Sequence, residues 1–355
     1  MILEGKTILV TGGTGSMGKT FVRRVLTGEL GTPRKVIVFS RDEAKQHDMR
    51  MSYLNKLVAT DEVIYRNFMG VLEFRIGDIR NYSDVCSAIK GADIIVNAAA
   101  LKQVPACEYF PTQAVLTNCM GASNIVQAIR QNDYPVDTVI AVSTDKACKP
   151  VNVMGMTKSI QERIITTANI LNPSTRFICV RYGNVIASRG SVIPLFIDQI
   201  RNGGPVTVTV PEMTRFLMSL DQAVNTVFSA LKEADPGDTY IPVVSSATVM
   251  NIAKALIGNR PIDIEVTGIR PGEKMHEILI SEEEANHCIK QGEYYVILSM
   301  LPELTNNKKK APNAVLKEYS SADSVLDLEG TIDLFKKHHV MVEDIEMSNS
   351  GELLR

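Results

Sequence analysis

The sequence predicts an α/β fold in which a doubly wound parallel sheet is joined to a smaller C-terminal region. Three observations lead to this fold class. Short apolar runs alternate with helix-like stretches through the first half of the chain, a glycine-rich turn joins the first run to the first helical stretch, and the alternation ends after about Gly183. Such alternation is typical of parallel strands with helices on both faces of the sheet.

Strands are expected at the apolar runs, several of which are continuous and rich in Val and Ile, as in strands buried on both faces. These strands are Lys6–Val10, Lys35–Phe39, Glu73–Ile76, Asp93–Ala98, Thr138–Ser143 and Arg176–Arg181. Helices are expected between them, at Ser16–Thr27, Asp42–Leu57, Ser83–Lys90, Pro111–Gln131 and Val153–Ile170.

Composition narrows the class of protein. The chain has 355 residues, 45% of them hydrophobic, which is enough for a substantial core. Its formal net charge of -2 makes nucleic acid a poor partner. The sequence has neither the ~18-residue apolar run of a membrane span nor a secretory signal, so we expect a cytoplasmic protein with no membrane association. The six cysteines form no CxxC pair, which predicts free thiols and no metal site.

A phosphate-binding turn, TGGTGSMG, follows the first expected strand. Gly12 permits a tight turn, Gly15 lets the backbone approach a pyrophosphate, and Gly18 allows close packing of the next helix. The N-terminus of that helix attracts the anion through its N–H groups and dipole. The turn therefore predicts a Rossmann-type sheet that binds a dinucleotide. The contacts expected here come from Gly12, Thr14, Gly15, Ser16, Met17 and Gly18.

The end of the second strand favours NADP over NAD. An acidic residue at this place would accept a hydrogen bond from the ribose 2′-hydroxyl of NAD. Ser40 and Arg41 stand there instead, and they can hold a 2′-phosphate through charge-assisted hydrogen bonds. Asp42 is evidence against NADP, although it can equally cap the next helix.

Further cofactor contacts are expected after the third and fourth strands. Asp78, followed by Ile79, can meet the adenine, and the small side chains of Ala98, Ala99 and Ala100 leave room for a flat cofactor. Residues 1–183 are therefore expected to be an NADP-binding domain. Residues 184–355 are expected to be a substrate-binding region, and the chain is expected to interleave between the two.

Reactive side chains follow the fifth strand. Thr144, Asp145 and Lys146 end this strand, and open α/β sheets bind ligands at the carboxyl ends of their strands. Met154 and Lys158 lie four residues apart on the next helix, so they project from the same face. Thr144, Asp145 and Lys146 are therefore expected to face the cofactor.

The motifs resemble those of the extended short-chain dehydrogenase/reductase family, whose Tyr-x-x-x-Lys pair would fall at Met154 and Lys158. Within it, the chain is similar to the polysaccharide-biosynthesis branch that contains the UDP-N-acetylglucosamine 4,6-dehydratases, in a subtype with Met-x-x-x-Lys. The matching stretches, over roughly residues 5–280, are TGGTGSMG, FSRDE, NAAALKQVP, STDKACKPVNVMGMTK, RYGNVIASRGSVIPLF, TRFLMSLDQA and IRPGEKMHEIL.

The resemblance implies NADP-dependent 4,6-dehydration of a UDP-N-acetylhexosamine, with UDP-N-acetylglucosamine the expected substrate, for surface glycan synthesis. Inversion or retention at C5 stays open. Hydride leaves C4 of the hexose, a base removes the C5 proton, an acid protonates the departing C6 hydroxyl, and hydride returns to C6. The resemblance makes Lys146 the base and Asp145 the acid, and it has Lys158 orient the nicotinamide ribose.

Lys146 must be neutral to act as a base, and burial or a nearby cation would lower its pKa from the ordinary value of ~10.4. Desolvation would keep Asp145 protonated. Because Met154 has no proton to exchange, the C4 hydroxyl must be served by Thr144, by Asp145 or by an ordered water near Lys158.

The resemblance also implies a nucleotide-sugar pocket. Asn184, Arg215 and Arg270 match residues around the substrate diphosphate and uridine, and guanidinium groups suit phosphate oxygens. Glu273 resembles a carboxylate that accepts from the uridine ribose hydroxyls. The substrate contacts expected come from Lys102, Asn184, Arg189, the backbone at Val206, Arg215, Arg270 and Glu273.

Two other functions stay open. A nucleotide-sugar 4-epimerase needs no C5 base or C6 acid and typically retains Tyr, so Asp145-Lys146 and Met154 count against it. The missing Tyr hydroxyl instead suggests a catalytically inert dinucleotide-binding regulator. In each case a homo-oligomer is expected, with helices Pro111–Gln131 and Val153–Ile170 as the candidate interface.

Overall fold

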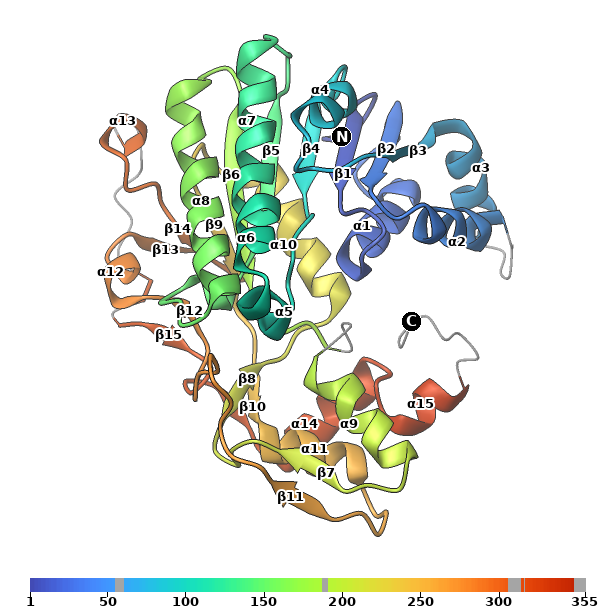
Figure 1. The fold of residues 1–355 in the computed structure, drawn as a ribbon, viewed down its shortest axis with the longest axis vertical. Coiled ribbons are helices and arrows are strands. Elements are labelled where there is room, and N and C mark those ends of the chain that lie inside the picture. Colours follow the sequence, from blue (N-terminus) through green and yellow to red (C-terminus); the bar gives the residue numbers. More distant parts are fainter. Residues whose placement is uncertain (55–60, 187–190, 306–313, 316, 348–355) are drawn as a thin grey trace.

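A computed structural model describes residues 1–54, 61–186, 191–305, 314–315 and 317–347. Its centre is a nine-stranded sheet of order β13-β14-β9-β6-β5-β4-β1-β2-β3 (Figure 1). The strands from β9 to β3 pair in parallel, and the β13–β14 hairpin adds an antiparallel edge. The strand order reverses between β1 and β4, which is the place where doubly wound sheets bind their ligands.

The sheet forms where the sequence has its apolar runs. On β1, Ile8 and Val10 belong to one buried cluster and Leu9 to another, so alternate side chains fill the two faces. The expected doubly wound α/β fold is confirmed. The strands are β1 (Thr7–Thr11), β2 (Lys35–Ser40), β3 (Leu72–Ile76), β4 (Ile94–Asn97), β5 (Thr138–Thr144), β6 (Arg176–Tyr182), β9 (Thr239–Pro242), β13 (Cys288–Gln291) and β14 (Tyr294–Ile297).

Helices cover both faces of the sheet (Figure 1). One face is covered by α1 (Ser16–Leu26), α2 (Glu43–Leu54), α3 (Asp61–Val71) and α10 (Leu220–Glu233). The other face is covered by α4 (Tyr82–Ile89), α7 (Gly121–Gln131) and α8 (Val153–Leu171).

Several helix boundaries differ from the prediction. Asp42 precedes α2 and accepts a hydrogen bond from the Lys45 backbone at 3.0 Å, so it does act as a cap. The predicted end of this helix at Leu57 lies outside the described residues. The expected helix Pro111–Gln131 is divided into α6 (Pro111–Ala114), a π-helical segment η1 (Val115–Met120) and α7. The sequence analysis did not predict α3 or α5 (Val104–Tyr109).

The C-terminal region has its own core, in which Phe196, Leu256 and Phe335 are buried. The structure draws no clean boundary at residue 183, because α10 and three strands of the main sheet follow it. The division at this residue stays a prediction. The remaining elements are α9 (Val192–Arg201), β7 (Val206–Val208), β8 (Thr214–Phe216), β10 (Ser246–Thr248), α11 (Val249–Ile257), β11 (Ile264–Val266), β12 (Ile278–Ile280), α12 (Glu282–Ala285), α13 (Pro302–Thr305), β15 (Tyr319–Ser320), β16 (Val325–Leu326), α14 (Leu328–Lys337) and α15 (Val342–Met347).

Two further expectations can be compared with the structure. All six cysteines are free thiols, as predicted, and only Cys86 among them is partly exposed. No helix in the described ranges is long and apolar enough to cross a membrane.

Candidate active site

The glycine-rich turn lies at the strand-order reversal. Gly12 has φ +64°, and a Cβ atom there would come within 2.8 Å of the Ala98 oxygen and the Ala99 nitrogen. A Cβ on Gly18 would come within 2.6 Å of the Gly13 Cα, so α1 packs directly on the turn. Both glycines are therefore required by close backbone approach.

The first turn of α1 is suited to an anion. The helix begins after Gly15, whose φ and ψ are −76° and 167°, and no described side chain caps it. Its leading N–H groups and the positive end of its dipole can therefore hold a phosphate. Thr14, Ser16 and Met17 lie in the same turn.

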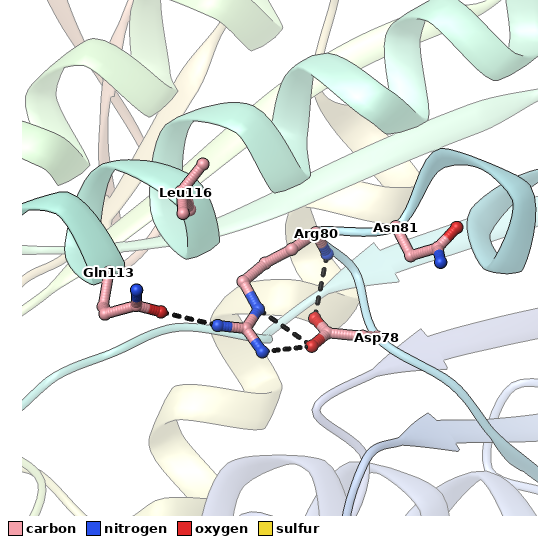
Figure 2. Close-up of a pocket in the computed structure, with 5 residues that line it drawn as sticks. All are labelled: Asp78, Arg80, Asn81, Gln113 and Leu116. Carbon is pink, nitrogen blue, oxygen red and sulfur yellow. Dashed lines mark hydrogen bonds and ion pairs between the residues drawn. The ribbon is translucent and has the colours of Figure 1, made fainter.

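A pocket after β3 is lined by Asp78, the expected adenine contact, and by Arg80. Arg80 donates to the Asp78 carboxylate through Nε at 2.8 Å and Nη2 at 2.5 Å, and to Gln113 at 2.6 Å (Figure 2). Arg41 lies 3.8 Å from the same carboxylate. Burial acts to raise the Asp78 pKa, but the hydrogen bonds from Arg80 lower it overall. The pocket is lined by Asp78, Arg80, Asn81, Gln113 and Leu116.

Arg80 was not predicted as a site residue, since only the fold shows that it reaches Asp78. Ser40 accepts from Gln46 at 3.0 Å. Ile79 is 4% exposed and packs in the core, so its side chain is occupied by the protein interior. Ala98, Ala99 and Ala100 are partly exposed and follow β4 beside Gly12.

The predicted acid and base meet at the carboxyl end of β5. Thr144 ends the strand, and its hydroxyl donates to Asp145 Oδ1 at 2.8 Å. Lys146 Nζ donates to the same oxygen at 3.1 Å and to Asn184 Oδ1 at 3.3 Å. Asp145 has no exposed surface, so its interaction with Lys146 is not the weak ion pair of a protein surface.

Glu277 completes this cluster, and the sequence analysis missed it. Its Oε1 lies 3.4 Å from Lys146 Nζ and 3.8 Å from Arg215 Nε. Glu277 belongs to the IRPGEKMHEIL stretch, from which Arg270 and Glu273 were selected instead. Its low exposure of 3% could not be read from that stretch.

The expectation for the Lys146 pKa was wrong in direction. Burial acts to lower this pKa, but the carboxylates of Asp145 and Glu277 outweigh burial and raise it. The pKa of Asp145 is raised as well, chiefly by burial. The pKa of Asp145 is thus shifted in the expected direction, whereas the raised pKa of Lys146 favours its ammonium form.

Two buried carboxylate oxygens have no hydrogen-bond partner among the described residues, Asp145 Oδ2 and Glu277 Oε2. An unsatisfied buried acceptor costs about 1–3 kcal/mol, so both positions are suited to a donor from a ligand. Both flank Lys146, which makes this cluster the candidate centre of chemistry.

Met154 and Lys158 both lie on α8, but Met154 has apolar neighbours whereas the Lys158 amine is hydrogen-bonded. Met154 is 5% exposed and packs in an apolar cluster with Cys107 and Ala114. Lys158 Nζ donates to the Val142 carbonyl at 2.6 Å and to Gln161 Oε1 at 2.7 Å. Burial lowers the pKa of Lys158 to about 8.

Some of the expected substrate-binding residues are buried, and others are exposed. Arg215 is 8% exposed and donates to the carbonyls of Thr214 at 2.7 Å and Lys274 at 3.1 Å. The backbone N–H of Val206 is bonded to the Asp263 carbonyl at 2.9 Å, so this group is already used within the fold.

The other expected substrate contacts lie nearer the surface. Arg270 is exposed, and its backbone N–H lies 3.5 Å from the carboxylate of Glu273. Lys102 is exposed in the segment after β4. Arg189 lies outside the described residues.

Comparisons with known proteins show the fold and the family of this chain. The structure shares the extended short-chain dehydrogenase/reductase fold of nucleotide-sugar dehydratases and epimerases. Residues 8–299 match the family model described as polysaccharide biosynthesis protein. The chain therefore belongs to the polysaccharide biosynthesis protein family.

Individual relatives carry different names. A UDP-glucose 4-epimerase from Rickettsia conorii is 39% identical over 353 residues, or 96% of this chain and 98% of that protein. The X-ray structure of Pen from Bacillus thuringiensis is 34% identical with a TM-score of 0.85, covering 96% of this chain and 100% of its own. DesIV, a dTDP-glucose 4,6-dehydratase from Streptomyces venezuelae solved with NAD and TYD, is 20% identical with a TM-score of 0.63, covering 76% and 86%, and supports the fold alone.

Proposed function

We propose that this protein is an NADP-dependent 4,6-dehydratase of a UDP-N-acetylhexosamine, with UDP-N-acetylglucosamine as the first candidate substrate. The observation that carries the proposal is the buried Asp145–Lys146 pair, whose carboxylate oxygen and amine lie 3.1 Å apart. Dehydration needs an acid and a base beside C5 and C6 of the sugar. Simple oxidation and reduction at C4 needs neither.

The residues around the glycine-rich turn fit a dinucleotide. Gly12 and Gly18 leave no room for side chains, and the first turn of α1 can hold the pyrophosphate. Arg41 and Arg80 place two guanidinium groups beside Asp78, and the presence of these cations supports the proposal of NADP over NAD. A nicotinamide held by this turn would supply the hydride acceptor for C4 of the sugar and the hydride donor for C6.

The protein's own part is proton transfer. A proton that moves from the Lys146 ammonium to the Asp145 carboxylate makes a neutral base and a protonated acid in one step. The raised pKa of Asp145 favours this transfer, and the raised pKa of Lys146 opposes it. Neutral Lys146 then takes the C5 proton, and the C5–H electrons enter the bond between C5 and C6 as the C6–O bond breaks. Asp145 protonates the leaving oxygen, which departs as water.

Other residues hold the reactants. Lys158, whose buried amine donates to the carbonyl of Val142 on β5, is proposed to orient the nicotinamide ribose. Asn184, Arg215, Arg270 and Glu273 are proposed to bind the diphosphate and uridine. The hydroxyl of Thr144 is proposed to serve the C4 hydroxyl, because Met154 packs in an apolar cluster and has no proton to exchange.

A nucleotide-sugar 4-epimerase is the second candidate, since the relatives at about 40% identity carry that name. The two reactions share C4 oxidation and differ in the steps after it. An epimerase would return hydride to C4 and would leave the Asp145–Lys146 pair without a proton to transfer at C5. An inert dinucleotide-binding regulator would do neither.

The test is to incubate the purified protein with UDP-N-acetylglucosamine in heavy water and to record product mass and NMR spectra, with UDP-glucose in parallel. We expect the loss of one water, a 4-keto-6-deoxy sugar and deuterium at C5. An unchanged mass with a galacto product would identify the epimerase. No product from either sugar, with intact NADP binding, would favour the inert regulator.

A further inference from the structure

The acid–base pair has a second carboxylate neighbour that no sequence motif selected. We propose that Glu277 is a positioning residue, which holds the Lys146 amine in place and keeps its own negative charge while the proton moves to Asp145. The inference rests on the proposed function for the role of Lys146 as a base. It adds Glu277 to the residues that act on Lys146, and it assigns different functions to the carboxylates of Asp145 and Glu277.

The backbone of Glu277 is held on both sides. Its N–H donates to Ser321 Oγ at 2.9 Å, and its carbonyl accepts from the Ser321 N–H at 2.8 Å. Ser321 Oγ in turn lies 2.6 Å from Thr214 Oγ1 on β8. The residue is 3% exposed, so its carboxylate has little freedom to move away from Lys146.

The charges around Lys146 make the two carboxylates unequal. Asp145 and Glu277 face its amine, and two cations, Arg215 and Lys274, act on the same cluster. Burial acts to raise the pKa of Glu277, but Lys146 and Arg215 lower it overall, whereas the pKa of Asp145 is raised. Asp145 Oδ1 is also the nearer acceptor, at 3.1 Å from Lys146 Nζ against 3.4 Å for Glu277 Oε1, so a proton that leaves Lys146 goes to Asp145.

The charge retained on Glu277 has a use later in the reaction. When neutral Lys146 takes the C5 proton it becomes an ammonium ion, and a carboxylate 3.4 Å away stabilises that positive charge. The unpartnered Oε2 of Glu277 can also accept from a sugar hydroxyl. Glu277 thus acts on the C5 step and not on hydride transfer at C4.

The test replaces the carboxylate with an amide of equal size, Glu277→Gln. The matched control is Glu284→Gln, which removes another buried carboxylate that is bonded to Arg181 at 2.8 Å, outside the cluster. The pKa of Lys146 is measured by NMR titration of ¹³Cε-labelled lysine, with the signal assigned from the Lys146→Arg spectrum. This readout does not require turnover.

We expect Glu277→Gln to lower the Lys146 pKa by about 1–3 units, because it removes an adjacent opposite charge. We expect kcat for water loss and C5 deuterium exchange to fall together by about 10²-fold, with KM little changed, since a small misplacement of the base has an effect of that size. Glu284→Gln should leave the Lys146 titration and the kcat as in the wild type.

An unchanged Lys146 titration in Glu277→Gln would overturn the inference, as would equal losses of activity in the two glutamine variants. If Glu277→Gln does not fold, Glu277→Asp is used instead. This variant keeps the negative charge but moves it away from Lys146 by one methylene, so we expect a smaller decrease in the Lys146 pKa. Failure of the wild type to release water from the sugar would refute the proposed function, whereas the titration would still decide whether Glu277 controls Lys146.

Discussion

Replacing Gly155 by alanine should displace Lys146 of the acid–base pair, although Gly155 is not itself a member of the pair. Gly155 follows Met154 at the start of α8, and a Cβ atom there would come to 3.0 Å from the Lys146 carbonyl carbon and closer still to its oxygen. Pro150 Cβ would lie 3.2 Å away on another side. To restore an ordinary carbon–oxygen contact of about 3.3 Å, the turn that carries Lys146 must move by roughly 1 Å.

Two opposing effects determine how much Gly155→Ala changes the free energy of unfolding. Alanine in a helix is favoured over glycine by about 0.5–1 kcal/mol. Overpacking of a filled site costs about 1–3 kcal/mol, and backbone on the opposing side cannot rotate away. We therefore expect Gly155→Ala to lower the free energy of unfolding by about 1–2 kcal/mol. The displacement of Lys146 should lower kcat by about 10²-fold.

The assays are thermal denaturation and the rate of water loss from UDP-N-acetylglucosamine. The matched control is Gly70→Ala in α3, where an added Cβ would meet no atom within 4 Å. This control should be as stable as the wild type or slightly more stable, with unchanged kcat. A Gly155→Ala protein with wild-type melting temperature and kcat would refute the packing argument.

Three further predictions concern the cofactor and the assembly. Arg41→Ala should weaken NADP binding by about 10- to 100-fold, as expected for the loss of a charge-assisted hydrogen bond. The affinity for NAD should stay unchanged in calorimetric titrations. An equal loss of affinity for both cofactors would exclude a contact between Arg41 and the 2′-phosphate. Gly18→Ala should abolish dinucleotide binding, because its Cβ would lie 2.6 Å from the Gly13 Cα, and unimpaired binding would show that the turn can open. Met156 and Ile160 are 47% and 50% exposed on one face of α8, so Met156→Glu should convert a homo-oligomer to monomers in light-scattering measurements; a wild-type protein that is already monomeric would contradict this interface.

Six of the nine strands of the main sheet could be predicted because both faces of the sheet are buried. The run Thr7–Thr11 is buried at every position with an apolar centre, and a run of that kind between helical stretches has few alternatives to a central parallel strand. The π-helical segment Val115–Met120 could not be predicted, because six residues between two α-helices are too few to show a period of their own. Helix α5 was missed because it has only six residues, too few for a clear period.

The site was predictable where residues are close in the chain. Asp145 and Lys146 are adjacent, so their pairing follows from the strand end alone. Glu277 and Arg80 were missed because their partners are set by tertiary packing and by loop geometry. The same cause explains the wrong direction for the Lys146 pKa. The sequence indicated burial, but it carried no sign of the second carboxylate, Glu277, which outweighs burial only together with Asp145.

The central claim is that hydride removed from C4 of the sugar returns to C6. The most direct measurement uses UDP-N-acetylglucosamine with deuterium at C4 and follows the label by ²H NMR. The account predicts a product in which the deuterium lies in the C6 methyl group, and it predicts that Lys146→Ala does not form this product. Deuterium that stays at C4 of a galacto sugar would contradict the dehydratase and establish an epimerase.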